Sequence, residues 1–334
     1  MSASSYDVYV TFSGKSKTPI QHVRSFSASG KDQGAVTPDY DELRGIALDG
    51  SGRLYLAVAN KNVSAIDLFA ATIEKDGTRE LIGTILTPPT SAVHPHPYGL
   101  TFDRNGVLYV STQDTNCVTG YAIGTQSPPQ VSPIPVASAL TASFPNGSFY
   151  AGQFVAAVEP IMHGSVTPPS VPANLGGLSA SVVGASRHSV RGVLATPNAL
   201  YVADEANDRI GIYDLTSGAY KRAITGTGRS SPRHVVDGPV GLAYDAKRGN
   251  LYIGSSKNAC IFVYAEKSRT LSRLACDDTK LAKVSGLACA PDGTLFAASR
   301  ASAAIFTVDT SSGKIAPFVD GLADAPECLL VVPG

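Results

Sequence analysis

The sequence predicts an all-β protein, a single β-propeller that spans residues 1–334, from three observations. One pattern recurs six times: a variable residue, usually followed by Gly and an aliphatic residue, then a turn and Leu-Tyr or a close variant. Apart from one long gap, the copies are 42–54 residues apart. The chain has 32 Gly, 22 Pro and only 16% charged residues, which suits short strands joined by tight turns. A repeat of this length built from strands and turns is typical of propeller blades.

Each copy predicts two neighbouring antiparallel strands of one blade. The variable residue, Gly and aliphatic residue begin the innermost strand, and the Leu-Tyr segment forms the second strand. The five contiguous copies pair Arg44-Gly45-Ile46 with Leu54-Tyr55-Leu56, Tyr98-Gly99-Leu100 with Leu108-Tyr109-Val110, Arg191-Gly192-Val193 with Leu200-Tyr201-Val202, Val240-Gly241-Leu242 with Leu251-Tyr252-Ile253, and Ser285-Gly286-Leu287 with Leu295-Phe296-Ala297.

The sixth copy is split between the two ends of the chain. Glu327-Cys328-Leu329 provides its inner strand and Asp7-Val8-Tyr9-Val10 its second strand. An open ring would leave two exposed strand edges, which promote aggregation. We therefore expect strands from both termini to share one blade and close the ring.

The number of blades depends on the gap of 93 residues between Tyr98 and Arg191, about twice the usual spacing. A degenerate copy that ends in Phe149-Tyr150-Ala151-Gly152-Gln153 fits inside this gap, so we favour seven blades. Six blades with one long insertion is the alternative. On either interpretation, residues 125–185 form a degenerate blade or a Pro-rich insertion.

Composition excludes some function classes. The formal net charge is zero, so no electrostatic footprint favours nucleic acid or an anionic membrane. No apolar stretch approaches the ~20 residues that span a bilayer, and no leader pattern precedes the first repeat. We expect a cytoplasmic protein, or a secreted one if a signal peptide was removed. The oligomeric state stays open.

Five cysteines without metal-ligand spacing favour a reducing compartment. Cys260 and Cys276 are symmetric about a predicted turn near residue 268, so they face each other on adjacent strands. They form either a disulfide or a pair of small buried hydrophobic residues.

The residue before each repeat Gly begins an inner strand, so these residues should gather around the propeller axis. This axial ring comprises Arg44, Tyr98, Arg191, Val240, Ser285 and Glu327. We predict catalytic roles for Arg44, Tyr98, Arg191 and Glu327, and a substrate-binding role for Ser285. The loops that enter the inner strands lie on the same face, where binding groups usually occur, and they add His94, His96, His188, Arg233 and His234 as substrate-binding candidates. Phe149 could supply apolar surface to the same pocket.

The two axial arginines have two interpretations. They could bind loop carbonyls or pair with Asp41, Glu42 or Asp237, or they could act as fork-shaped donors to an oxygen-rich ligand. Two such charges ~8 Å apart repel by about 2 kcal/mol at an effective dielectric constant near 20. We therefore expect Glu327, another carboxylate or a ligand oxygen to offset the repulsion. The charges of the loop at residues 204–209 are expected to be solvated.

Residues 202–214 resemble an NHL-type repeat, and the repeated pattern is similar to that of gluconolactonase/senescence-marker-protein and strictosidine-synthase-like propellers. Gluconolactonase-like enzymes hold a divalent metal with Glu, Asn and Asp on inner strands. Here the matching positions are Arg44, Tyr98, Arg191, Val240 and Ser285, and a hard cation prefers several oxygen ligands. We therefore expect no metal and no other cofactor. Residues 144–154 carry a second resemblance, to fungal propeller-type hetero-Diels–Alderases.

These resemblances imply a metal-independent enzyme of secondary metabolism that binds an oxygenated, largely apolar small molecule in the channel mouth. A hetero-Diels–Alder-type cyclase is the most concrete form, because such chemistry needs positioning and hydrogen-bond donors but no nucleophile. Two alternatives remain: an acid/base enzyme such as a lactonase, hydrolase or strictosidine-synthase-like catalyst, and a non-catalytic NHL-type module that binds protein.

Overall fold

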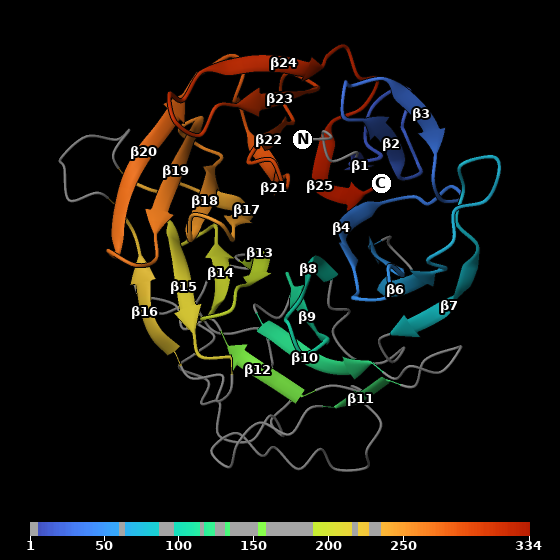
Figure 1. The fold of residues 1–334 in the computed structure, drawn as a ribbon, viewed down its shortest axis with the longest axis horizontal. Coiled ribbons are helices and arrows are strands. Elements are labelled where there is room, and N and C mark those ends of the chain that lie inside the picture. Colours follow the sequence, from blue (N-terminus) through green and yellow to red (C-terminus); the bar gives the residue numbers. More distant parts are fainter. Residues whose placement is uncertain are drawn as a thin grey trace.

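The computed structural model describes residues 6–59, 64–86, 97–113, 117–123, 131–133, 153–157, 190–215, 220–226 and 235–334. In these residues the chain forms strands and no helix, and the strands make six antiparallel sheets arranged as blades around a central axis (Figure 1). No described helix is therefore available to cross a membrane.

The blades follow one another along the chain, each running from an inner strand to an outer edge. They are β25 (Pro326–Pro333), β1 (Tyr6–Phe12), β2 (Arg24–Ser27) and β3 (Asp32–Ala35); β4 (Leu43–Leu48), β5 (Leu54–Ala59), β6 (Ser64–Phe69) and β7 (Leu81–Leu86); β8 (Pro97–Phe102), β9 (Val107–Thr112) and β10 (Cys117–Ile123), with β11 (Val131–Pro133) and β12 (Gln153–Ala157) both paired to β10; β13 (Val190–Ala195), β14 (Leu200–Asp204), β15 (Arg209–Tyr213) and β16 (Tyr220–Ile224); β17 (Pro239–Asp245), β18 (Asn250–Ser255), β19 (Cys260–Ala265) and β20 (Thr270–Cys276); and β21 (Val284–Cys289), β22 (Leu295–Ser299), β23 (Ala304–Val308) and β24 (Ile315–Val319).

The all-β propeller class is confirmed, but the preference for seven blades was wrong. The inner strands contact one another in the closed order β25, β4, β8, β13, β17, β21 and back to β25, which leaves no space for a seventh. Residues 153–157 had been assigned to the end of a degenerate blade; they instead pair with β10 at the outer edge of the third blade. The remainder of the long gap lies outside the described residues.

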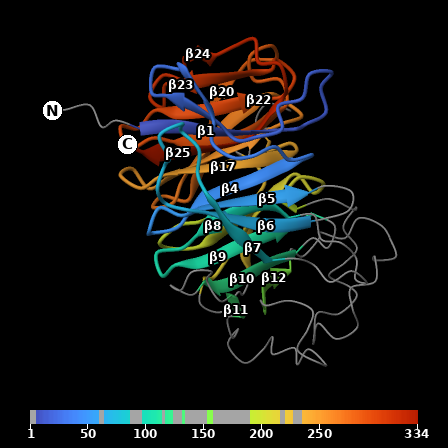
Figure 2. The same cartoon turned by 90° about the vertical axis from the view of Figure 1, so that its right-hand side faces the viewer.

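The predicted closure of the ring by both termini is confirmed. Strand β25 pairs antiparallel with β1, with Val10 opposite Leu329, and Figure 2 shows these two strands side by side. The Thr11 hydroxyl accepts the Cys328 N–H at 3.0 Å and donates to the Arg44 carbonyl at 2.8 Å. One side chain therefore joins the first strand, the last strand and the next blade.

Every copy of the repeat contains a β-bulge at its first two residues. In the second blade, Leu43 lies opposite Val58 and Ile46 opposite Leu56, so two residues face only one on the partner strand. The same register shift occurs at the matching place in the other five blades. A bulge bends the strand and redirects side chains.

The repeat glycines are required by the close approach of adjacent inner strands. A Cβ atom built on any of them would lie 2.2–2.8 Å from backbone of the next inner strand, which is closer than real Cβ atoms come. The glycines are Gly45, Gly99, Gly192, Gly241 and Gly286. Only the sixth equivalent position has a side chain, that of Cys328, at the junction where the ring closes.

The recurring Leu-Tyr segment stabilises each blade in two ways. The Leu residues are fully buried between blades, namely Leu54, Leu108, Leu200, Leu251 and Leu295. In two blades the Tyr hydroxyl reaches the hairpin that precedes it: Tyr55 lies 3.2 Å from Asp49, and Tyr109 lies 3.5 Å from Asp103.

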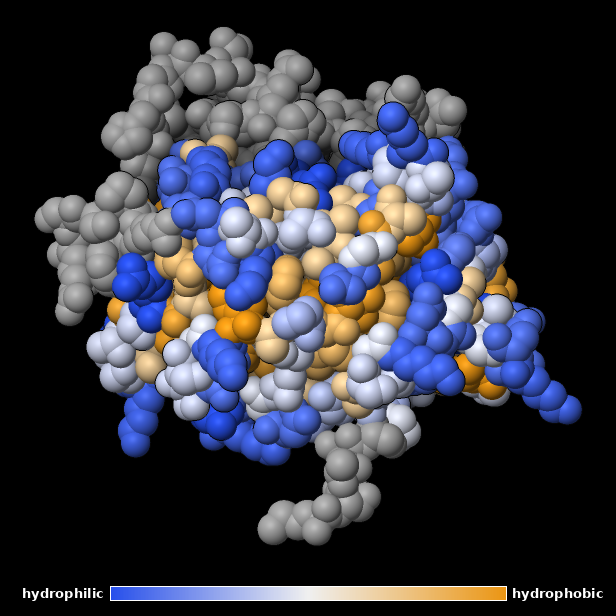
Figure 3. All heavy atoms as spheres, turned by 90° about the horizontal axis from the view of Figure 1, so that it is seen from above, coloured by the Kyte–Doolittle hydropathy of each residue, from blue (hydrophilic) through white to orange (hydrophobic). Residues whose placement is uncertain are grey.

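The outer wall of the propeller is mixed in character. Figure 3, which views the ring from the side, shows apolar residues in a band midway between its two faces, with polar residues along both edges. Outer strand β24 is only half-buried, and its Phe318 and Val319 pack on the core beneath it. Pro317 lies in the same strand and removes one N–H from the exposed edge, which discourages pairing with another chain.

Cys260 and Cys276 lie directly opposite each other on β19 and β20 and form a disulfide, so the first of the two alternatives holds. Persistent disulfides are typical of oxidising compartments. The expected reducing compartment remains a prediction, now with this observation against it.

We predict that Gly241→Ala will lower the free energy of unfolding by about 3 kcal/mol or more, because the new Cβ would meet the Ser285 carbonyl oxygen at 2.2 Å. Gly50→Ala is the control, since a Cβ at Gly50 meets nothing within 4 Å. Urea denaturation followed by circular dichroism measures both. Equal, small losses would contradict the close-approach explanation.

We also predict that Cys260→Ser/Cys276→Ser will lower the free energy of unfolding by about 3 kcal/mol under non-reducing conditions, the loop-closure value for a separation near 16 residues. The unsubstituted chain should lose the same amount in dithiothreitol. If the reductant leaves its stability unchanged, the disulfide is absent in solution.

Candidate functional site: the mouth of the axial channel

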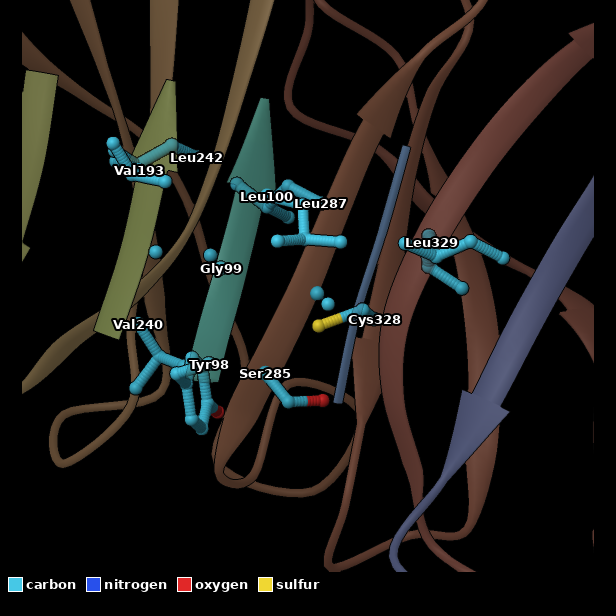
Figure 4. A pocket seen from close by; sticks show the side chains of 15 residues that line it. Tyr98, Gly99, Leu100, Val193, Val240, Leu242, Ser285, Leu287, Cys328 and Leu329 are labelled. Atoms are coloured by element: carbon cyan, nitrogen blue, oxygen red, sulfur yellow. The ribbon is translucent and has the colours of Figure 1, made fainter. Parts of the chain in front are cut away.

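The inner strands enclose an axial cavity of about 450 Å³ that is lined by three consecutive residues from most blades. Figure 4 shows Tyr98, Val240 and Ser285 at one end, the glycines and Cys328 in the middle, and aliphatic side chains beyond. Regular strand alternation would send every second side chain away from the axis. The bulges explain why successive residues face the same cavity.

Glu327 lies at the centre of the polar end and is only 1% exposed. Its Oε1 atom is 3.0 Å from Nη2 of Arg300 and 3.7 Å from Nη1 of Arg44. Its Oε2 atom is 3.5 Å from the Tyr98 hydroxyl, which donates to it. The carboxylate is therefore shared among three donors from three different blades, and it supplies the negative charge expected beside Arg44.

Arg44 is held from a second side as well. Its Nη2 group lies 2.9 Å from Glu42, and Nη1 donates to the Leu43 carbonyl. Glu42 in turn pairs with Lys15 at 2.9 Å. Of the expected partners of Arg44, Glu42 is the one it meets in the structure.

Arg191 differs from Arg44 because only part of its guanidinium group is engaged. Its Nε atom lies 2.5 Å from Oε2 of Glu205, and its Cζ atom lies 5.0 Å from the centre of the Tyr98 ring, in cation–π geometry. Among the described residues, its Nη1 and Nη2 groups have no hydrogen-bond partner. These contacts fix the orientation of the fork and leave its two ends available.

Burial controls the protonation of two neighbouring groups. Desolvation, followed by the charge of Glu327, raises the pKa of Tyr98 well above its ordinary value, so the phenol stays neutral and able to donate. Desolvation likewise raises the pKa of the Cys328 thiol to about 12. Neither group is an anion at neutral pH, which favours a donor role for Tyr98 over a role as base.

The other two members of the predicted axial ring line the same end of the cavity. Val240 is an apolar wall residue, 7% exposed. The buried Ser285 hydroxyl donates to the Pro326 carbonyl at 2.7 Å, so its proton is engaged within the fold. The structure thus brings together Arg44, Tyr98, Arg191, Val240, Ser285 and Glu327, while their catalytic and binding roles remain predictions.

The remaining substrate-binding candidates, His94, His96, His188, Arg233, His234 and Phe149, lie outside the described residues. Among the residues that are described, no group of three or more His, Cys, Asp or Glu side chains is placed to hold a metal ion.

Sequence analysis missed two residues of this cluster, Glu205 and Arg300. Both lie in loops that join the second and third strands of a blade, which had been expected on this face. The charges at 204–209 were wrongly expected to be solvated: Glu205 pairs with Arg191, and Asp204 and Arg209 form a buried pair at 2.7 Å. The one available signal was the shared face, which makes any charge in these loops a candidate partner for the axial ring.

We predict that Glu327→Gln will lower the free energy of unfolding by about 3 kcal/mol, because it removes a buried carboxylate and leaves Arg44 without its inner partner. The matched control, Glu42→Gln, removes a more exposed partner of the same arginine and should cost less than ~1 kcal/mol. Chemical denaturation at pH 7 compares the two. Similar losses would show that Glu327 does not organise the cluster.

No protein-family model and no curated protein matches this chain. The solved structures that resemble it share its fold at low identity. A chain of a nidogen/laminin complex is 10% identical, with 98% of each chain covered and a TM-score of 0.62. A streptogramin B lyase is 13% identical, with 98% of this chain and 88% of that chain covered and a TM-score of 0.54. A candidate 6-phosphogluconolactonase from Bacteroides fragilis is 14% identical, with 99% of both chains covered and a TM-score of 0.54. The chain is thus similar to six-bladed propellers found both in enzymes and in a protein–protein complex.

Proposed function

We propose that this propeller is a metal-independent enzyme that binds an oxygenated, largely apolar small molecule at the mouth of its axial channel. The observation that carries the proposal is the Arg191 fork, which Glu205 and the Tyr98 ring hold in place while its Nη groups stay open. A pre-oriented guanidinium with free donors matches a carbonyl or carboxylate oxygen. The apolar wall beside it suits the rest of such a substrate.

The donor set favours chemistry in which charge develops on a substrate oxygen. Tyr98 and Arg191 could stabilise a carbonyl whose electron density rises in the transition state, an effect worth about 10²- to 10³-fold for a single donor. Glu327 is engaged by three donors and is poorly placed to accept a further proton. Cyclisation of the hetero-Diels–Alder type fits this set because two bonds form with no proton transfer, and positioning supplies much of the rate.

A lyase or hydrolase that uses acid/base catalysis is the second candidate. The observation in its favour is the contact of 3.5 Å between the Tyr98 hydroxyl and Glu327, along which a proton could pass. The two candidates differ in pH dependence. An acid/base enzyme should lose activity as an essential carboxylate is protonated, whereas a cyclase should show a flat profile between pH 6 and 9.

A protein-binding role has weaker support. Among the described residues, the exposed large hydrophobic side chains are Ile73, Leu81 and Val235, which belong to two different blades. Scattered apolar residues of this kind are normal on a protein surface.

We expect Arg191→Ala and Tyr98→Phe to reduce turnover by about 10²-fold or more with folding intact, because each removes a donor to the developing oxyanion. The assay generates an o-quinone methide in the presence of an electron-rich alkene and compares cycloadduct formation with the uncatalysed background. Arg24→Ala, which removes an arginine paired with Asp32 on β2, is the control and should retain full turnover.

Two results would contradict this function. One is the absence of acceleration by the unsubstituted chain across a panel of such substrate pairs. The other is acceleration that survives in both Arg191→Ala and Tyr98→Phe. Loss of activity below pH 6 with a single carboxylate-like transition would support the acid/base enzyme in place of the cyclase.

A further inference from the structure

The axial cavity changes character along its length. Beyond the glycine layer, the residue that follows each repeat glycine or Cys328 is aliphatic in all six blades: Ile46, Leu100, Val193, Leu242, Leu287 and Leu329. Each keeps 5–8% of its surface exposed, whereas the Leu residues between blades are completely buried. The residual exposure is to the cavity that these six side chains line. We call them the aliphatic ring.

Water gains little in the aliphatic ring. A buried water molecule needs two to four polar partners, and these six side chains offer none. Apolar surface that faces a cavity is stabilised when an apolar group covers it. The favoured occupant of this layer is therefore a hydrocarbon segment.

The glycine layer limits the shape of that segment. The inner strands approach so closely here that a Cβ would not fit between them, and Cys328 contributes the one side chain of the layer (Figure 4). A chain that passes from the mouth to the aliphatic ring must cross this layer, so it must be slender. At the mouth, the same molecule meets the open Nη groups of Arg191 and the neutral Tyr98 hydroxyl.

We propose that the substrate class is an anionic amphiphile, with a carboxylate or similar oxyanion head on Arg191 and Tyr98 and an unbranched apolar chain through the glycine layer into the aliphatic ring. This inference rests on the proposed function, since it takes the channel mouth as the substrate site. It adds the position of the apolar part and a requirement for chain length.

The test uses n-alkyl carboxylates from butanoate to decanoate and the full chain, with binding measured by calorimetry. Each added CH₂ that enters the aliphatic ring should tighten binding about fourfold, the change expected for burying one methylene. Leu287→Asn places an amide in the ring and should remove this dependence. Leu81→Asn, at a leucine that is 44% exposed, is the control and should keep it.

Cys328 gives a second readout that needs no variant of the ring. Its thiol lines the glycine layer, so decanoate should slow its reaction with a small mercurial several-fold, while butanoate should not. Mass spectrometry of the labelled peptide follows the reaction, and Cys328→Ser supplies the background from Cys289 and other thiols. This readout decides the matter if Leu287→Asn does not fold.

The outcomes separate this inference from the proposed function. Affinity that is independent of chain length, together with an unprotected Cys328, overturns the amphiphile proposal even if Arg191→Ala still abolishes turnover. Affinity that rises with chain length but is unchanged in Arg191→Ala supports the aliphatic ring and overturns the position assigned to the head group. Chain-length dependence lost in Leu287→Asn, with uniform weakening in Arg191→Ala, supports both parts.

Discussion

The close backbone approach of adjacent inner strands at the repeat glycines is the constraint on which the rest of this structure depends. A side chain at these positions would collide with the next strand at 2.2–2.8 Å, so the ring can close at this radius only because Cβ atoms are absent. The bulge that each glycine shares with the preceding residue turns that residue towards the axis. One local device therefore sets both the packing of the blades and the membership of the channel mouth.

This coupling makes the site a product of ring closure. Glu327 and Cys328 are contributed by β25, which is positioned only when it pairs with β1 near the start of the chain. Thr11 then bridges Cys328 and Arg44, and Ser111 plays a related part at the third blade, where it accepts the Gly99 N–H and donates to the Arg191 carbonyl. The carboxylate that organises the arginines thus reaches its place as part of the same event that closes the ring.

Repeat spacing predicted the propeller, the split blade and the identity of the axial residues, because these follow from a pattern written locally in each copy. It failed on blade number, because a distance of 93 residues records chain length and says nothing about pairing. Residues 153–157 pair with β10, a contact that depends on the third dimension. The partners of the axial arginines were missed in part for the same reason: Arg300 and Glu327 belong to different blades, and Arg191 meets Glu205 across a bulge rather than the Asp237 that sequence proximity suggested.

The amino-acid sequence by itself determined the strand repeat, the glycine at each bulge and the chemical type of each axial side chain, since these depend on local backbone geometry and residue type. Only the tertiary structure decided how many blades close the ring, which carboxylate neutralises which arginine, and which guanidinium keeps open donors. Those outcomes depend on distances between residues far apart in the chain, and such distances are fixed by the packing of the blades against one another.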